Sequence, residues 1–318
     1  MLRKSFMSLA FCVFCLLCSC QKKEAEPETA ELPEGQYLVV LGIAQDAGFP
    51  HINYPEEWED VYKGNRKRQL ATCLGLVDTK QKQKWIFEAS PDMPQQLHNL
   101  EARHLKTENL TDGVFLTHAH IGHYTGLMHF GREAMGANRI PVYAMPKMKS
   151  FLQENGPWSQ LVKLNNIEIR ELADETPVEL NQSLKVTPFL VPHRDEFSET
   201  VGYKIEGREK TALFIPDINK WRIWEKDILE EVKKVDYAFL DATFLENGEI
   251  PRDMNEVPHP FIEETAKLFE DQPAEVKSKV VFIHFNHSNG ALNASNQKRK
   301  SLEKQGFRFA AEGDIFDL

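Results

Sequence analysis

Residues 113–126 read "GVFLTHAHIGHYTG". This stretch begins with a short apolar run, which predicts a buried strand. Three histidines follow within six positions, His118, His120 and His123. Alternate residues at a strand end point the same way, so His118 and His120 are expected to face one point, with His123 arriving one turn later. Imidazole nitrogen is a preferred ligand of Zn²⁺, so the stretch predicts a metal site rather than three histidines that merely pack.

The composition is that of an ordinary globular protein. The chain has 318 residues, of which 42% are hydrophobic and 27% charged, enough to bury a substantial core. Its net charge of -10 argues against a nucleic-acid partner, because phosphate contacts require clusters of Lys and Arg. The most basic stretch, residues 63–69, is short and is interpreted as a surface loop.

The N-terminal segment is expected to lie outside the fold. Residues 1–20 have a basic start and a short apolar run that ends in "LCSC", which resembles the lipobox of bacterial lipoproteins. This resemblance implies a signal peptide and a lipid on Cys20; a cleaved secretory peptide and an uncleaved anchor are the alternatives. Residues 21–35 are polar and rich in Pro and Glu, typical of a flexible tether. We therefore expect a body held on a membrane of the cell envelope in the periplasm or outside, and Gln21 favours the outer membrane.

The cysteines agree with this division. Of five cysteines, only Cys73 lies in the predicted body, so no disulfide is expected inside it. Cys73 stands in an apolar stretch and is interpreted as a small buried hydrophobic residue.

From residue 36 onward, apolar runs alternate with amphipathic stretches, and no repeat or linker interrupts residues 36–318. The many short strands favour one α/β domain built on two sheets. Strands are predicted at 37–44, 70–77, 85–89, 113–117, 141–145, 167–172, 184–191, 200–207, 211–217, 235–241 and 280–286. Helices are predicted from about residue 91 and at 147–154, 220–234, 260–271 and 293–306.

The segment "HAHIGH" resembles the His-x-His-x-Asp-His signature of the metallo-β-lactamase fold superfamily, and it departs from that signature at Gly122. The likeness runs from about Tyr37 to Leu318. It includes His193 in "FLVPHRDE", Asp217 in "ALFIPDINKW" and His284 in "VVFIHFNHSN". The resemblance implies an αββα sandwich of two mixed sheets flanked by helices, and a metal-dependent hydrolase.

A closer resemblance is to the branch that contains the pyrroloquinoline-quinone biosynthesis B protein and the cyclic phosphodiesterase of phosphonate metabolism. The phrases "LGIAQDAGFP", "FEASPDMPQQL" and "HFNHSN" carry it, together with His259 in "VPHPF". This branch implies a small-molecule phosphodiester or similar ester as substrate. The fold hosts many reactions, so the substrate itself is not fixed.

The resemblance also assigns metal ligands. It implies that His118, His120 and His193 hold a first ion, that Asp217 bridges, and that His123 and His284 hold a second ion. Gly122 has no side chain and cannot replace the Asp of the signature. Three outcomes stay open: a single-ion site, a substitute carboxylate from Asp46 in "AQDAGFPH", or a degenerate site that binds a ligand without catalysis. An alternative reading makes Asp46 a residue that caps its own loop.

Other residues have secondary roles in this interpretation. His287 is an alternative to His284 as the last ligand, or it orients the substrate. His259 is either a general acid for the leaving group or only the start of a helix. His51 is placed at the mouth of the site or simply in solvent. Asp92 and Asp241 are interpreted as structural, a helix cap and a strand-end residue.

The expected function is therefore a secreted, lipid-anchored hydrolase with one or two Zn²⁺ ions, although iron or manganese would suit the same ligands. Zinc lowers the pKa of bound water from 15.7 toward about 7, and Asp217 would position that water. His259 or His287 would protonate the leaving group. Two alternatives remain: an iron-binding redox enzyme, and a non-catalytic ligand-binding lipoprotein with a degenerate metal site.

Overall fold

The computed structural model describes residues 32–318, and residues 33–318 form one compact unit. The predicted signal peptide, Cys20 and nearly all of the predicted tether lie outside the described residues. Within residues 32–318, no helix is long and apolar enough to cross a membrane.

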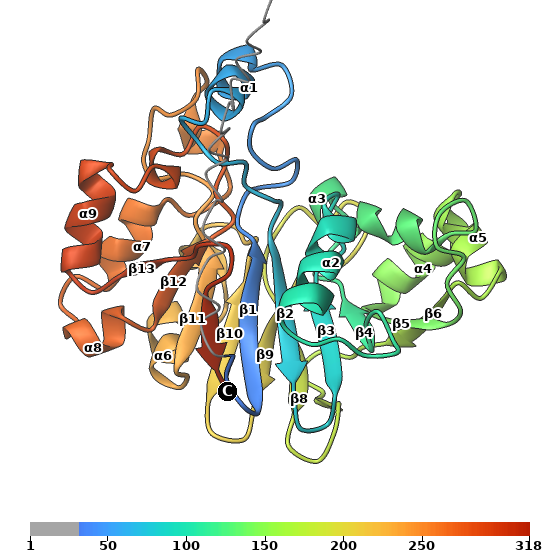
Figure 1. Cartoon of the computed structure of the whole chain (residues 1–318). Coiled ribbons are helices and arrows are strands. Elements are labelled where there is room, and N and C mark those ends of the chain that lie inside the picture. The colour runs from blue at the N-terminus through green and yellow to red at the C-terminus, as the bar shows by residue number, and fades with distance from the viewer. Residues whose placement is uncertain (1–31) are drawn as a thin grey trace, which may run out of the picture. The chain divides into compact units, whose positions relative to one another are not determined.

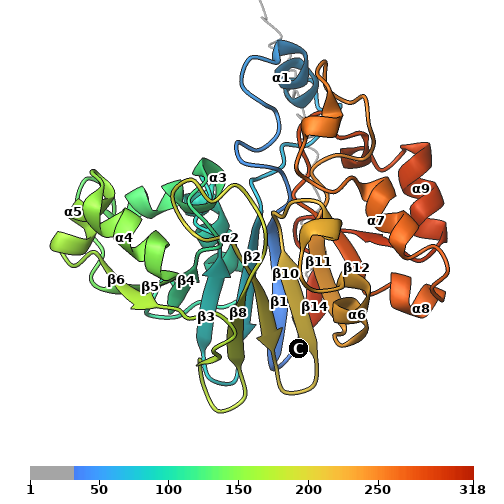
Figure 2. The same cartoon turned by 180° about the vertical axis from the view of Figure 1, so that it is seen from behind.

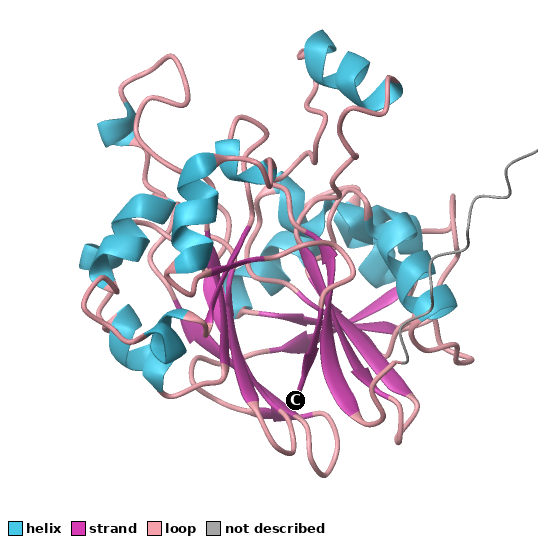
Figure 3. Ribbon diagram, turned by 60° about the vertical axis from the view of Figure 1, so that its left-hand side comes forward, coloured by secondary structure: helices cyan, strands magenta, loops and turns pink. Residues whose placement is uncertain are grey.

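Two seven-stranded sheets face each other (Figures 1 and 3). The first has the order β14 (Ile315–Asp317), β1 (Gln36–Gly42), β2 (Cys73–Asp78), β3 (Gln83–Phe87), β4 (Gly113–Phe115), β5 (Ile140–Ala144) and β6 (Ile167–Glu171). The second has the order β13 (Arg308–Phe309), β12 (Val280–Ile283), β11 (Tyr237–Asp241), β10 (Thr211–Ile215), β9 (Val201–Glu206), β8 (Lys185–Leu190) and β7 (Val178–Glu179). Both sheets contain parallel and antiparallel pairs, so the predicted sandwich of two mixed sheets is confirmed.

Helices cover the outer faces of both sheets. The first sheet packs against α2 (Met93–Arg103), α4 (Pro146–Glu154) and α5 (Trp158–Lys163). The second packs against α6 (Ile228–Lys233), α7 (Ile262–Leu268), α8 (Ala274–Lys277) and α9 (Gln297–Lys304), which lie together on the other side of the molecule (Figures 1 and 2). Helix α1 (Pro55–Tyr62) lies beyond the strand ends, at the same end of the molecule as the short helix α3 (Ile121–Tyr124) (Figure 1).

Strand β1 shows why a central strand of the first sheet is apolar along most of its length. Leu38 and Val40 belong to the cluster between the sheets, whereas Tyr37, Val39 and Leu41 pack under the outer helices. Successive side chains of a strand point to opposite faces, so a strand buried on both faces needs a continuous apolar run. This run is what made residues 37–44 recognisable as a strand.

The connections place the ends of several strands at one edge of the sandwich. In the first sheet β1, β3 and β4 run in the same direction, and in the second sheet so do β8, β10, β11 and β12. The residues that follow these strands therefore meet at this one edge, where Ala44 after β1 pairs with Phe285 after β12.

The predicted helix 220–234 is wrong as one element. A 3₁₀ turn at Trp221–Ile223 is followed by extended backbone at Trp224, and α6 begins only after Asp227, whose side chain accepts a hydrogen bond from the backbone of Leu229. Trp221 and Trp224 are both buried, and the break in the helix lets both indoles reach the core. The prediction that Cys73 is buried is confirmed, and burial raises its thiol pKa well above the usual value.

Candidate metal centre

The predicted ligands lie just after strand ends at the shared edge. His118 and His120 follow β4, and His120 is the residue before α3, which carries His123. Asp217 follows β10 and His284 follows β12. These segments are far apart in sequence, and the parallel strands bring them together.

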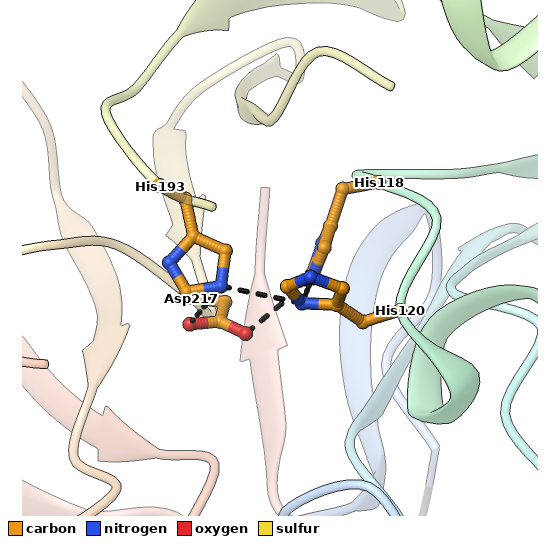
Figure 4. Close-up of side chains that lie close together, drawn as sticks. All are labelled: His118, His120, His193 and Asp217. Atoms are coloured by element: carbon orange, nitrogen blue, oxygen red, sulfur yellow. Dashed lines mark hydrogen bonds and ion pairs between the residues drawn. The ribbon is translucent and has the colours of Figure 1, made fainter. Parts of the chain in front are cut away.

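The first cluster contains His118, His120, His193 and Asp217 (Figure 4). His118 Nε2 lies 2.8 Å from His120 Nδ1, and His193 Nε2 lies 3.3 Å from the same atom. The Asp217 oxygens lie 3.4 Å from His118 Nε2 and 3.3 Å from His193 Nε2. Four tetrahedral ligands at zinc distances lie about 3.3 Å from one another. The spacing of these four donors therefore fits one zinc-sized ion.

The second cluster contains Asp46, His123 and His284. His123 Nε2 lies 3.3 Å from Asp46 Oδ1 and 3.8 Å from Asp217 Oδ2. The same Asp217 oxygen faces His118 of the first cluster. Asp217 thus stands between the two clusters, where a bridging ligand would be needed.

Gly122 makes room for Asp46. A Cβ atom at position 122 would lie 2.4 Å from both Cα and Oδ1 of Asp46. The Asp46 carboxylate therefore occupies the space in which the Asp of the signature would have its side chain. Its Oδ1 is buried without a hydrogen-bond partner, so Asp46 does not use this atom to cap its own loop. Of the three outcomes left open by the sequence, the geometry favours the substitute carboxylate.

The buried polar atoms test whether an ion fits. Asp46 Oδ1, His123 Nε2 and His284 Nε2 are buried and have no hydrogen-bond partner. Leaving a buried polar atom unsatisfied costs about 1–3 kcal/mol. Three such atoms around one point are explained by a cation that binds all of them, and a mixed imidazole and carboxylate set suits zinc. The residues present therefore fit a metal ion.

The outward nitrogen of most ligand histidines is already engaged. His118 Nδ1 lies 2.9 Å from Thr117 Oγ1, His193 Nδ1 lies 3.2 Å from Asn219 Oδ1, and His284 Nδ1 lies 3.0 Å from Thr243 Oγ1. His120 uses its Nε2 instead, 3.1 Å from Glu196. Such contacts fix the ring orientation and leave the other nitrogen for the ion.

Glu88 is a residue that the sequence interpretation missed. It is fully buried, accepts a hydrogen bond of 2.6 Å from Thr117 Oγ1, and lies 3.2 Å from His123 Nδ1. Glu88 is also linked to His118 through Thr117, because the same Oγ1 atom lies 2.9 Å from His118 Nδ1. An acidic residue directly after the apolar run "WIF" was the available signal, because a strand that is buried on both faces rarely ends in an isolated carboxylate.

Electrostatics distinguishes the two clusters. Burial and the neighbouring His123 lower the pKa of His118 well below its usual value. Burial also acts to lower the pKa of His123, but Glu88 and Asp46 outweigh it and raise that pKa well above the usual value. The carboxylates around His123 thus favour a positive charge at this position, and a divalent ion would supply it.

His259 lies beside the first cluster, together with Asp241. Its Nδ1 lies 2.9 Å from Asp241 Oδ2 and 3.1 Å from Asp217 Oδ1. Burial acts to lower the pKa of His259, but Asp241 and Asp217 raise it to about 10. Asp241 also accepts hydrogen bonds from the backbone of Ile218 and Thr243. Reading Asp241 as structural was thus incomplete, because it also orients His259.

His287 is not grouped with the donors of the second cluster. Its Nδ1 lies 2.8 Å from Glu57 Oε1, and its ring stacks on His51 with centroids 4.3 Å apart. Of the two alternatives for the last ligand, His284 is the one grouped with Asp46 and His123.

Asp92 precedes α2 as predicted but does not cap it by its side chain, which instead accepts hydrogen bonds from Ala71 and Arg68.

Comparison with known proteins places the chain. The family model described as the beta-lactamase superfamily domain matches residues 84–285. Coenzyme PQQ synthesis protein B of Methylorubrum extorquens (strain PA1) is 24% identical over 318 residues, covering 89% of this chain and 100% of the relative. The protein of the same name from Bradyrhizobium diazoefficiens is 25% identical over 87% of this chain and 97% of its own length.

Solved structures agree on the fold. Zn(2+)-bound PqqB from Methylobacterium extorquens superposes with a TM-score of 0.72 at 21% identity, covering 89% of this chain and 100% of that one. A diphosphatase from the PhnP family gives a TM-score of 0.58 at 18% identity, covering 89% and 97%. The predicted resemblance to the metallo-β-lactamase superfamily and its PqqB-like branch is confirmed. The chain therefore belongs to the family described as the beta-lactamase superfamily domain.

Proposed function

We propose that this chain is a zinc-dependent hydrolase that cleaves a phosphodiester or similar ester with water. The observation that carries the proposal is the pair of ligand clusters that share Asp217, with Asp46 positioned against Gly122 to complete the second. Similarity to a Zn(2+)-bound PqqB and to a diphosphatase of the PhnP family supports the metal and the substrate class.

The first ion would be held by His118, His120, His193 and Asp217, and the second by Asp46, His123 and His284 with Asp217 shared. Zinc bound there would supply Lewis acidity, activating water and polarising the ester oxygen under attack. Iron or manganese would suit the same donors, and elemental analysis distinguishes them.

The chain's own residues would carry the proton transfers. Burial acts to raise the pKa of Asp217, but His193 and His259 hold it well below its usual value, so its carboxylate stays ionised and is able to orient the attacking water. His259 is held by Asp241 and Asp217 through Nδ1, and its raised pKa keeps a proton available for the leaving group. Asp241 acts as the positioning residue for this imidazole.

The test combines metal content with turnover. The full-length chain, purified in detergent and loaded with zinc, is expected to contain two ions per chain and to hydrolyse bis(p-nitrophenyl) phosphate. Removal of zinc by a chelator should abolish turnover, and added zinc should restore it. Bound metal without hydrolysis of phosphodiesters or other esters would contradict the proposal and support a ligand-binding lipoprotein. Bound iron with oxygen-dependent turnover would instead support the redox alternative.

We also propose that the body is attached to the cell envelope, preferably the outer membrane, by a lipid on Cys20. Support comes from the sequence of residues 1–35 alone: a basic and apolar leader, "LCSC", and a polar tether. Labelled palmitate should enter the wild-type chain and a Cys18→Ser control, but not a Cys20→Ser variant. Incorporation into the Cys20→Ser variant would contradict lipidation at this residue.

A further inference from the structure

A compact group of rings joins the segment between β1 and β2 to the segment that follows β12. His51 and His287 stack with centroids 4.3 Å apart and planes 17° from parallel. The ring centroid of Tyr54 lies 4.2 Å from that of His287 and 5.6 Å from that of His51. We call His51, Tyr54 and His287 the ring cluster. None of these three residues belongs to the ligand clusters or to the hydrophobic core.

Glu57 holds the ring cluster in place. It is only 9% exposed, and its two oxygens are both used: Oε1 faces His287 Nδ1 at 2.8 Å, and Oε2 accepts a hydrogen bond of 2.8 Å from the backbone of His51. Trp58 Nε1 donates to the carbonyl of His51 at 3.1 Å. A buried carboxylate with both oxygens committed fixes the rings before any ligand arrives.

The ring cluster continues directly from the metal ligands. The segments of Ala44 and Phe285 pair side by side, and Asn286 donates to the side chain of Gln45 at 2.9 Å. One segment runs from ligand Asp46 to His51, and the other runs from ligand His284 to His287. Three residues of extended chain span at most about 11 Å. The Cα atom of His287 therefore lies no more than about 11 Å from the Cα atom of His284 in the second cluster.

Three large apolar side chains at the ring cluster are exposed. Tyr54 is 38% exposed, and the adjacent Ile52 and Trp58 are 74% and 39% exposed. Large apolar side chains exposed together mark a binding surface when they adjoin a functional site. Within residues 32–318, the carboxylate that pairs with the ring cluster is Glu57, and the planar faces of the rings stay available beside it.

We propose that the ring cluster is a subsite that binds a planar aromatic group of the substrate, such as an aryl ring or a nucleobase, next to the scissile ester. This inference rests on the proposed hydrolase function and narrows its substrate class to esters that carry a ring. The substrate ring packs against Tyr54 and the edge of the His51–His287 stack while the ester reaches the metal ligands. Aromatic pairs of this kind contribute about 0.5–1.5 kcal/mol, equivalent to about two- to tenfold in affinity.

The first experiment measures binding and needs no turnover. Phenylphosphonate and methylphosphonate present the same anion to a metal and differ only in the ring. On the zinc-loaded full-length chain, calorimetry should show phenylphosphonate binding about two- to tenfold more tightly. Tyr54→Ser removes the exposed ring and keeps a good residue before α1, so it should reduce this preference while methylphosphonate binding stays unchanged. Tyr62→Ser, at the other end of α1 and 76% exposed, is the matched control.

The second experiment uses two substrates with the same leaving group, bis(p-nitrophenyl) phosphate and methyl p-nitrophenyl phosphate. Tyr54→Ser should raise KM for bis(p-nitrophenyl) phosphate more than KM for methyl p-nitrophenyl phosphate, whereas Tyr62→Ser should change neither value. Equal affinity of the two phosphonates for the wild-type chain, or an equal loss in Tyr54→Ser, would overturn the subsite and leave the hydrolase intact. If the zinc-loaded chain hydrolyses neither phosphodiester, the proposed function fails and the subsite fails with it.

Discussion

The two ligand clusters reach similar chemistry by different routes. In the first, every donor follows a strand end in the order expected from the superfamily signature, and four contacts of 2.8–3.4 Å join the four residues. In the second, one donor comes from the loop after β1, because Gly122 lacks a side chain and Asp46 fills its place. A missing ligand in a motif is therefore weak evidence for a missing site when a neighbouring loop can reach the same point.

The comparison predicts that the first cluster dominates metal binding and catalysis. His118→Ala removes a buried imidazole whose Nε2 lies 2.8 Å from His120 Nδ1, so zinc affinity of this cluster should fall by more than about 100-fold and turnover should be lost. Zinc competition with a coloured chelator measures the affinity, and His98→Ala, on the exposed face of α2, is the control. Unchanged zinc content and turnover in His118→Ala would remove the first cluster from the mechanism.

The second cluster should depend on Asp46 and Gly122 together. Asp46→Ala is expected to lower zinc from two ions per chain to one, with the first cluster still filled. Gly122→Ala should have the same effect and also destabilise the fold by about 1–3 kcal/mol, because the new Cβ meets the backbone Cα of Asp46 at 2.4 Å. Elemental analysis and urea unfolding measure the two effects, with Glu56→Ala as the control. Two ions retained in Asp46→Ala would show that Asp46 is not a ligand.

A smaller effect is expected from Glu88, the buried carboxylate that faces His123 of the second cluster. Glu88→Gln keeps the shape of the buried side chain but removes the charge that faces His123 at 3.2 Å. Loss of such a supporting contact typically weakens metal binding by about 10- to 100-fold. The second ion should therefore weaken more than the first in a zinc titration, and Glu108→Gln, exposed on the surface, should change neither. Equal weakening of both ions would indicate that Glu88 acts through Thr117 on His118 as well.

The contrast also separates what the sequence predicts from what it does not. The first cluster follows from local patterns, because an apolar run and the residue after it are neighbours in sequence. The role of Asp241 does not, since its partner His259 lies 18 residues away and is brought back only by the packing of the chain after β11. Asp46 was identified as a candidate, but only the space above Gly122 shows why it reaches His123. The helix 220–234 was misjudged because its period fits a helix, while two buried indoles favour the break.

The loop between Asp241 and His259 belongs to neither cluster, and its stability should respond to pH separately. Burial raises the pKa of Glu249 to about 7, and this carboxyl accepts a hydrogen bond of 2.8 Å from the backbone of Glu246. Between about pH 4.5 and 7 the folded chain keeps this proton while the unfolded chain has lost it, so the free energy of unfolding should fall as pH rises through this window.

Because Glu249 is only partly buried, the free energy of unfolding should change by about 1 kcal/mol, which is less than the full pKa shift would give. Glu249→Gln carries no titrating proton and should remove this part of the pH dependence, whereas the exposed Glu256→Gln should keep it. Urea unfolding at pH 5 and pH 8, at constant zinc, measures the difference. If Glu249→Gln and the wild-type chain lose the same stability between these pH values, Glu249 is not the source of the dependence. The ligand clusters would contribute with the opposite sign, because acid competes with metal for their donors.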